Sequence, residues 1–338
     1  MPLIYDKGFS TEAAEPSNII GVHDRKIIDT IISQLQEDDI FINTTWIKLD
    51  SDLKHIIDVA KTESRKVYVY SGADWDNRYA PEGLPNRYGS VHNALSDCDV
   101  SYIGNTLGEY YFSFWIDFVY ENLHKYTDFN TYDIKVPMKH YMCLNRKPHR
   151  HRIELINEIK DAKLLDYGYV SYGTDKIRDL ITLSKDIKNV EGDIAVGGDV
   201  GITNDINSLG HQDNWNNHFL NVVSETTTYT DVFLTEKTLK PIVGRRPFII
   251  LGDRNIYKLL QDLGFDTFED MYGTGHSLGF TEQRINWIVS NLKDLINKGD
   301  AHLPELFESL KPRLEHNFEN FVRIAKINRK NIENLLDK

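Results

Sequence analysis

Short apolar runs alternate with stretches of helical periodicity over the first 137 residues of the chain. The predicted strands, rich in β-branched and aromatic residues, are Ile19–Ile20, Ile40–Ile42, Lys66–Tyr70 and Cys98–Gly104. The predicted helices, with apolar residues on one side, include Ile27–Ile32, Leu53–Ala60 and the aromatic stretch Tyr110–His124. This alternation predicts a parallel sheet covered by helices, with ligands bound beyond the carboxyl ends of its strands.

A second series of the same kind begins near Val136. Its predicted strands are Tyr141–Leu144, Tyr167–Tyr172, Leu220–Val223 and Pro247–Leu251. Its predicted helices are one ending at Lys160, three capped by Thr235, Asp253 and Thr281, and Leu306–Leu336 with a kink at Pro312. Because 338 residues exceed one ordinary domain, we expect two domains, residues 1–137 and 138–338.

The most informative stretch runs from Phe219 to Gly252, where an apolar strand ends at Glu225 and a short helix follows. Thr235 is a good N-cap, Glu236 suits the first helical turn, and Lys237 adds a cation to the free N–H groups there. Such a helix start can hold a phosphate. Glu225 and Glu236 stand where sugar and ribose hydroxyls could be bound, so the stretch predicts a nucleotide-sugar site. Taken alone, Thr235-Glu236-Lys237 more often marks an ordinary helix cap with a surface ion pair.

An acidic and aromatic loop follows the Lys66–Tyr70 strand. Asp74 or Asp76 could serve there as a general base for an incoming hydroxyl, and Trp75 could form an apolar wall. The alternative is a polar surface loop whose aspartates make Asx-turns.

A basic turn, Asn145–Arg152, joins a predicted strand to a predicted helix and forms a natural anion site, although a solvated surface turn is an equal alternative. His140, His149 and His151 have no metal-ligand pattern with nearby carboxylates, so no metal is expected.

Composition narrows the class of protein. The formal net charge of −12 argues against bulk electrostatic binding of nucleic acid. Cys98 and Cys143 are too few for a disulfide framework. No stretch has the roughly 18 apolar residues of a membrane span, nor does the start resemble a secretion signal. We therefore expect a soluble protein of the cytoplasm, in a bacterium or a phage-infected host.

Several segments, in order, resemble family 10 of the glycosyltransferases, the inverting α-1,3/4-fucosyltransferases. They are Leu144–Asn145, the turn ending at Arg152, Ser224–Glu225–Thr226, Phe233–Lys237 and Pro247–Gly252. The chain departs from the family's pattern in carrying Thr226 where an Asn is usual, and in a Glu225 to Glu236 spacing one residue longer.

The resemblance implies a GT-B fold, meaning two Rossmann-like parallel-sheet domains with the active-site cleft between them. The N-terminal domain would bind the acceptor and the C-terminal domain the nucleotide-sugar donor. The implied donor-binding residues are Asn145 lining the cleft, Arg152 and Lys237 at the diphosphate, Glu225 at the sugar or nucleotide, and Glu236 with its N-cap Thr235 at the ribose. Asp74 or Asp76 would be the catalytic base.

The expected function is therefore glycosyl transfer from a nucleotide diphosphate to an acceptor hydroxyl, with inversion and without metal or cofactor. Trp75, Arg78 and Tyr79 are the expected acceptor contacts. The acceptor is either a glycan or, as in phage-type DNA glycosyltransferases, a hydroxymethylated base in DNA. A non-catalytic nucleotide-sugar-binding module is the alternative from another class.

Overall fold

The computed structural model describes residues 2–6, 19–43, 51–70, 75–76, 94–104, 110–111, 113–145, 149–172, 206, 208–210, 212–228 and 232–333, with backbone alone at 19–22, 75–76, 110–111 and 171–172. The chain forms two compact units. Unit 1 comprises Met1–Phe118, Thr230–Val232 and Ile324–Lys338, and unit 2 comprises Val119–Tyr229 and Phe233–Arg323. This grouping by contact differs from the expected division at residue 137, because residues 119–137 group with unit 2 and the chain's end groups with unit 1.

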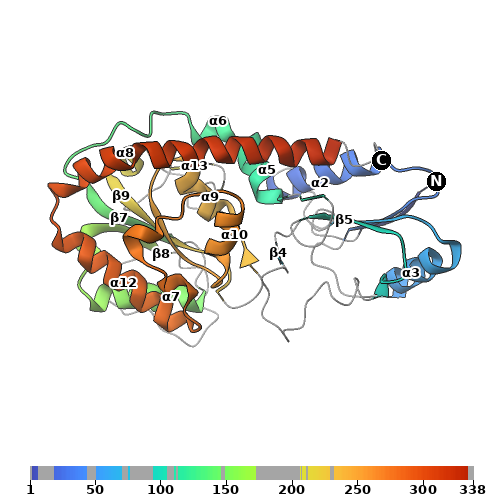
Figure 1. Ribbon diagram of the computed structural model, residues 1–338, viewed down its shortest axis with the longest axis horizontal. Helices are drawn as coiled ribbons and strands as arrows, with labels where there is room; N and C mark the ends of the chain where they lie inside the picture. The colour runs from blue at the N-terminus through green and yellow to red at the C-terminus, as the bar shows by residue number, and fades with distance from the viewer. Residues whose placement is uncertain are drawn as a thin grey trace. The chain divides into compact units, whose positions relative to one another are not determined.

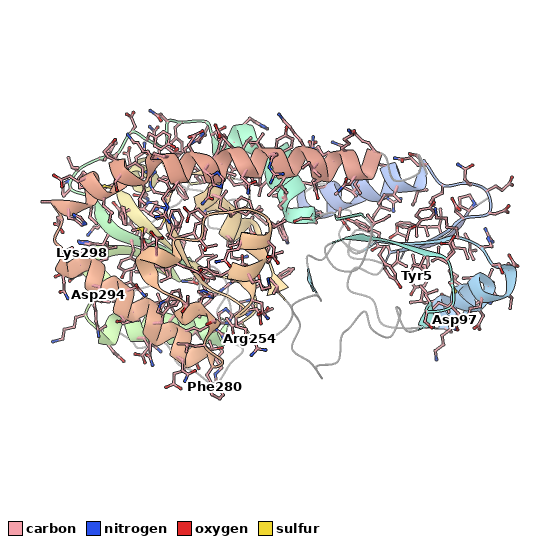
Figure 2. The ribbon with its side chains drawn as sticks, in the orientation of Figure 1. Tyr5, Asp97, Arg254, Phe280, Asp294 and Lys298 are labelled. Carbon is pink, nitrogen blue, oxygen red and sulfur yellow. The ribbon has the colours of Figure 1, made fainter. Side chains whose placement is uncertain are left out.

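Unit 1 contains a five-stranded sheet in the order β1-β2-β3-β5-β6, with every neighbouring pair parallel. The strands are β1 (Leu3–Asp6), β2 (Ile40–Asn43), β3 (Val67–Tyr70), β5 (Val100–Gly104) and β6 (Tyr110–Tyr111). The helices that begin in this unit are α2 (Ile19–Ile32), α3 (Ser51–Glu63) and α5 (Phe114–Glu121). Alternate residues of β2 and β3 pack with Tyr5 and the apolar face of α3 to form one buried core (Figure 2).

Two sequence predictions for unit 1 are wrong. The residues predicted as a strand, Ile19–Ile20, are the first two of helix α2, because they continue the apolar spacing that runs through Ile32. The aromatic stretch Tyr110–His124 is divided: Tyr110–Tyr111 pair with the end of β5, and helices α5 and α6 (Leu123–Tyr126) follow. Strand β1 was not predicted, since four residues are too few to show a period.

Unit 2 contains a four-stranded sheet in the order β11-β9-β7-β8, again parallel throughout. Its strands are β7 (Lys139–Asn145), β8 (Gly168–Tyr172), β9 (His218–Ser224) and β11 (Phe248–Leu251). Its helices are α7 (Arg150–Asp161), α8 (Gln212–Asn216), α9 (Glu236–Val243), α10 (Ile256–Asp262), α11 (Glu269–Tyr272), α12 (Thr281–Asn297) and α13 (His302–Glu333), the last turns of α13 grouping with unit 1. In Figure 1, α7 and α12 lie together on one side of this sheet and α9 lies on the other.

The strand order places a topological switch between β7 and β9. From β7 the chain moves outward to β8 on one side, and then returns to place β9 and β11 on the other. Loops that leave such neighbouring strands diverge and open a crevice at the carboxyl edge of the sheet, where ligands of open α/β sheets bind. The residues that end these two strands are Asn145 and Ser224. The switch therefore selects the loops after them as the place to look for a site.

Helix starts in unit 2 agree with the sequence at α9, differ by one or two residues at α10 and α12, and differ by four at α13, which begins at His302 and not at Leu306. Thr235 is the N-cap of α9, and its hydroxyl accepts a hydrogen bond from the backbone N–H of Lys237, as predicted. The N-cap of α10 is Asn255, whose N–H donates to the Asp253 carboxylate at 2.9 Å. The N-cap of α12 is Phe280, an exposed residue (Figure 2), and Thr281 is its first helical residue.

The two parallel α/β units confirm the fold class expected from the sequence. A further small sheet pairs β4 (Trp75–Asp76) with β10 (Val232–Phe233). Over the described ranges, no helix combines the length and apolar character needed to cross a membrane.

Candidate functional site

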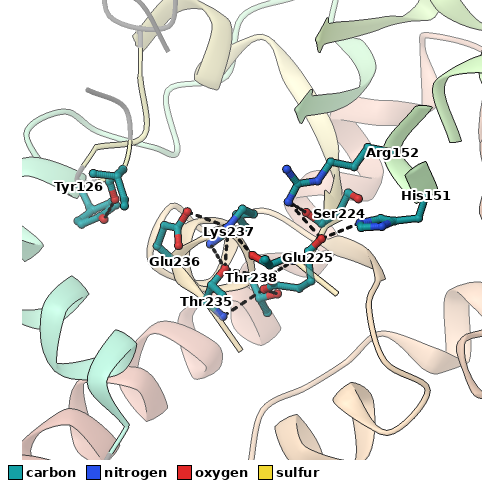
Figure 3. Close-up of polar contacts among 11 residues, drawn as sticks. Tyr126, His151, Arg152, Ser224, Glu225, Thr235, Glu236, Lys237 and Thr238 are labelled. Carbon is teal, nitrogen blue, oxygen red and sulfur yellow. Dashed lines mark hydrogen bonds and ion pairs between the residues drawn. The ribbon is translucent and has the colours of Figure 1, made fainter. Parts of the chain in front are cut away.

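The loop that follows β9, residues 224–228, is held from three helices. Its central side chain is Glu225, which has no exposed surface. One carboxylate oxygen accepts from the Thr238 hydroxyl at 2.6 Å and the Thr235 N–H at 3.2 Å. The other accepts from the Thr235 hydroxyl at 2.7 Å and the Thr226 N–H at 3.3 Å (Figure 3). The carboxylate of Glu225, the residue after β9, therefore holds the start of α9.

Helix α7 fixes the backbone of the same loop. The His151 imidazole Nε2 lies 2.9 Å from the Glu225 carbonyl oxygen, and since a carbonyl only accepts, this nitrogen carries the proton. Arg152 Nη2 donates to the carbonyls of Ser224 and Glu225 at 3.2 and 3.1 Å (Figure 3). Burial, with the neighbouring Arg152 charge, lowers the pKa of His151 to about 3, so this imidazole is neutral at physiological pH.

Helix α12 holds the far end of the loop. Arg284, almost fully buried, donates to the carbonyl of Thr228 and, at 2.7 Å, to that of Leu278. Thr281 and Thr228 hydroxyls lie 3.2 Å apart. The loop after β9 thus has partners on α7 and α12 for its backbone and on α9 for its side chains, and a rigid frame of this kind preserves the geometry of a binding site.

The first turn of α9 presents opposite charges side by side. Lys237 Nζ lies 3.0 Å from Glu236 Oε1, 3.1 Å from the Thr235 hydroxyl oxygen and 3.4 Å from that of Thr226. The Lys237 side chain keeps 30% of its surface exposed, whereas that of Glu236 keeps 10%. An exposed ammonium at a helix N-terminus is suited to a phosphate.

Glu236 is charged in this environment despite its burial. Burial alone would raise its pKa, but Lys237 and Lys240 outweigh that effect, and the pKa lies below its ordinary value. Its second oxygen, Oε2, is buried and has no hydrogen-bond partner within the described part of the chain. A buried carboxylate oxygen without a donor is costly in isolation, and a ligand hydroxyl would satisfy it.

Contacts join five of the six residues that the sequence suggested for the donor, namely Arg152, Glu225, Thr235, Glu236 and Lys237. Asn145 ends β7 at the topological switch, almost fully buried, with its amide donating to Cys143 Sγ at 3.3 Å. Arg152, Glu225, Thr235 and Glu236 are buried, whereas the Lys237 side chain is 30% exposed. Of the six, five are therefore buried and Lys237 alone is partly exposed.

The structure does not describe the side chains of the residues suggested for the base and the acceptor. Asp74, Arg78 and Tyr79 lie outside the described residues, and of Trp75 and Asp76 the backbone alone is described, as strand β4. The base and acceptor roles remain predictions. Among the described residues no group of three His, Cys, Asp or Glu side chains is placed to hold a metal ion.

Four residues of the site were not predicted from the sequence to act there. They are His151, which donates to the Glu225 carbonyl, Thr226, Thr238 and Arg284. Thr238 stands three residues after the N-cap, where a helix brings it to the same side, and this spacing could have indicated it. Arg284 is 56 residues from Thr228 and has no local signal.

Comparisons with known proteins give one distant likeness. No protein-family model matches the chain, and no curated protein matches it. A solved structure described as a crystal structure of α1,3-fucosyltransferase with GDP-fucose is similar, at 13% identity and a TM-score of 0.40, over 98% of this chain and 90% of that one. The resemblance to fucosyltransferases predicted from the sequence segments is confirmed as a distant one. It carries no weight for the function of this chain.

Proposed function

We propose that this protein is a glycosyltransferase that moves a sugar from a nucleotide-diphosphate donor to an acceptor hydroxyl. The observation that carries the proposal is the first turn of α9, where the partly exposed side chain of Lys237 adjoins a buried carboxylate oxygen of Glu236 that lacks a donor in the described part of the chain. A nucleotide sugar offers the complement, since it has a diphosphate and ribose hydroxyls a few bonds apart. The position of this turn at the carboxyl edge of a parallel sheet supports the same reading.

In the proposed reaction, negative charge builds on the diphosphate as the bond from the glycosyl carbon breaks. Lys237 and the N–H groups at the start of α9 would stabilise that charge. Arg152 is proposed as a second cation for the diphosphate; in this structure its guanidinium holds the backbone of Ser224 and Glu225. We assign the charge stabilisation to these protein groups and not to a metal ion.

The remaining donor roles follow from position. Glu236 Oε2 would accept a ribose hydroxyl, and Asn145 would line the crevice at the end of β7. Glu225 and Thr235 would complete the site beside Lys237. The attacking hydroxyl would lose its proton to Asp74 or Asp76, giving direct displacement with inversion. Trp75, Arg78 and Tyr79 are proposed to contact the acceptor.

Thermal unfolding in the presence of nucleoside diphosphates and their sugars tests the donor half of the proposal. A ligand that is present at 100 times its Kd stabilises the folded state by about 2.7 kcal/mol. We expect one nucleotide to raise the Tm without magnesium, and the matching sugar nucleotide to raise it further. If no nucleotide raises the Tm, with or without magnesium, the proposal fails.

Transfer itself separates the enzyme from a non-catalytic binding module. With the donor identified, we expect sugar release to water or transfer to an acceptor, and an Asp74→Asn, Asp76→Asn double variant should lose transfer but keep donor binding. Donor binding with no turnover on any acceptor would favour the binding module. Transfer to duplex DNA carrying hydroxymethylated bases, and not to glycans, would identify the acceptor as DNA.

A further inference from the structure

The hydrogen bonds around Glu225 require a carboxylate side chain and not an amide. Each of its two oxygens receives one backbone N–H, from Thr235 on one side and from Thr226 on the other. A glutamine amide would turn its NH₂ group toward one of these N–H groups in either orientation, and two donors cannot bond to each other. A carboxyl group, which has an acceptor oxygen on each side, can accept both N–H groups, and an amide cannot.

This carboxylate determines where the hydroxyl proton of Thr235 lies. A threonine hydroxyl has one proton to donate and two lone pairs to accept. The proton is used at 2.7 Å toward Glu225 Oε2. Both lone pairs are then available to Lys237, whose backbone N–H lies at 3.3 Å and whose Nζ lies at 3.1 Å. The Thr235 hydroxyl is thereby fully used, and its orientation depends on Glu225.

We propose that Glu225 is a positioning residue for Lys237 and acts through the Thr235 hydroxyl, without touching the donor. The proposal deepens the function proposed above, since Lys237 is the cation assigned there to the diphosphate. It accounts for a carboxylate with no exposed surface at the centre of the site. It also assigns Glu225 a role other than the direct donor contact expected from the sequence.

Two threonines provide a matched pair of variants. Thr235 and Thr238 each donate a hydroxyl hydrogen bond to Glu225, at 2.7 and 2.6 Å, and both are almost fully buried. Of these two threonines, Thr235 is the one that also contacts Lys237 Nζ. Thr235→Val and Thr238→Val therefore remove the same kind of bond from the same carboxylate, while Thr235→Val alone removes the contact with the lysine.

The first readout is the acylation rate of Lys237 relative to Lys240 in the ligand-free protein, measured by peptide mass spectrometry. We expect Thr235→Val and Glu225→Gln to raise this ratio several-fold, and Thr235→Ser to restore it. Thr238→Val should leave the ratio at the wild-type value although it lowers the Tm. Equal ratios in Thr235→Val and Thr238→Val, at similar Tm, would overturn the proposal.

The second readout is affinity for inorganic pyrophosphate. Loss of a well-placed charged hydrogen bond corresponds to about tenfold weaker binding, and we expect this in Thr235→Val and Glu225→Gln. In the Thr235→Val background, Glu225→Gln should have no further effect, because the path through the hydroxyl is already broken. If Glu225→Gln weakens pyrophosphate binding as much in the Thr235→Val background as in the wild-type protein, the proposal is contradicted. If wild-type protein binds neither pyrophosphate nor any nucleotide, the donor-site proposal fails, while the acylation ratio still decides the role of Glu225.

Discussion

Lys237 and Glu236, adjacent in the sequence, form an ion pair of 3.0 Å in the first turn of α9. The pair is asymmetric, because the ammonium keeps an exposed side and the carboxylate has a buried oxygen without a hydrogen-bond partner in the described part of the chain. Each group therefore has a separate ligand function to test, the ammonium toward phosphate and the carboxylate toward a hydroxyl.

Removing the ammonium should impair transfer far more than folding. For Lys237→Ala we expect about 10²-fold slower transfer, the size of effect found when one donor to a developing oxyanion is lost. The free energy of unfolding should fall by only about 1 to 2 kcal/mol, because the largely buried Glu236 loses its nearest cation but keeps the influence of Lys240. Steady-state transfer rates and urea unfolding measure the two quantities.

Lys240→Ala is the control for this prediction, because it removes a lysine from the same helix near the other end. It should leave the transfer rate near the wild-type value. A Lys237→Ala protein with normal turnover would exclude Lys237 from the reaction.

Removing the charge of Glu236 should distinguish a nucleotide from a bare diphosphate. If its Oε2 accepts a ribose hydroxyl, Glu236→Gln should weaken nucleoside diphosphate binding about tenfold, the effect of losing one charged hydrogen bond. Binding of inorganic pyrophosphate should not weaken, because that ligand has no ribose. Calorimetric titration of both ligands makes the comparison, and equal weakening of the two would rule out the ribose contact.

Much of this site was predictable because its signals are local. Thr235 caps α9 because a β-region threonine before Glu236 and Lys237 satisfies the first N–H groups, and that pattern is visible in the sequence. Asn145 and Ser224 end neighbouring parallel strands, and that placement follows from the parallel series of strands.

The other features of the site could not be predicted, because they depend on the direction of a side chain or on contacts between residues far apart in the sequence. Spacing placed Glu225 near the start of α9, but it left open whether the carboxylate faces a ligand or the Thr235 and Thr238 hydroxyls. The contact of Arg284 with Thr228 joins elements far apart in the chain. Ile19–Ile20 shows the same limit in the fold, because two β-branched residues suit either a strand or a helix start until the packing of α2 is known.

A buried arginine at the opposite edge of the unit 2 sheet should dominate its stability. Arg246 has no exposed surface and donates to the carbonyls of Thr131, Trp215 and His218 at 2.7 to 3.0 Å. Arg246→Met would leave these carbonyls unpaired at about 1 to 3 kcal/mol each, so we expect a loss of about 3 kcal/mol or more in the free energy of unfolding. Arg150→Ala, at an exposed i,i+4 pair, should cost less than about 0.5 kcal/mol. Similar losses in the two variants would contradict this account.

Two buried histidines should make unit 2 sensitive to mild acid. Burial lowers the pKa of both His151 and His218 to about 3, from 6.5. His218 is held neutral on both nitrogens, since Nδ1 faces the Asn214 carbonyl at 3.0 Å and Nε2 faces the Asn221 amide at 2.7 Å. Below pH 6.5 the unfolded chain binds these protons and the folded chain does not, so stability falls as the pH drops from 6.5 toward 3.

Each histidine should contribute a slope of about 1.4 kcal/mol per pH unit in that window. Because the unfolded histidines are only half protonated at pH 6.5, this slope is reached below that pH, and unit 2 should lose about 3 kcal/mol between pH 6.5 and pH 5, a large share of the stability of a typical domain. Because the chain has two units, amide exchange in β9 followed by mass spectrometry is a better measure than one global transition. His151→Gln keeps a donor for the Glu225 carbonyl and removes one titrating group, so it should lower the slope by about 1.4 kcal/mol per pH unit. An unchanged slope in this variant, or constant protection of β9 from pH 7 to pH 5, would mean that these imidazoles accept protons in the folded state.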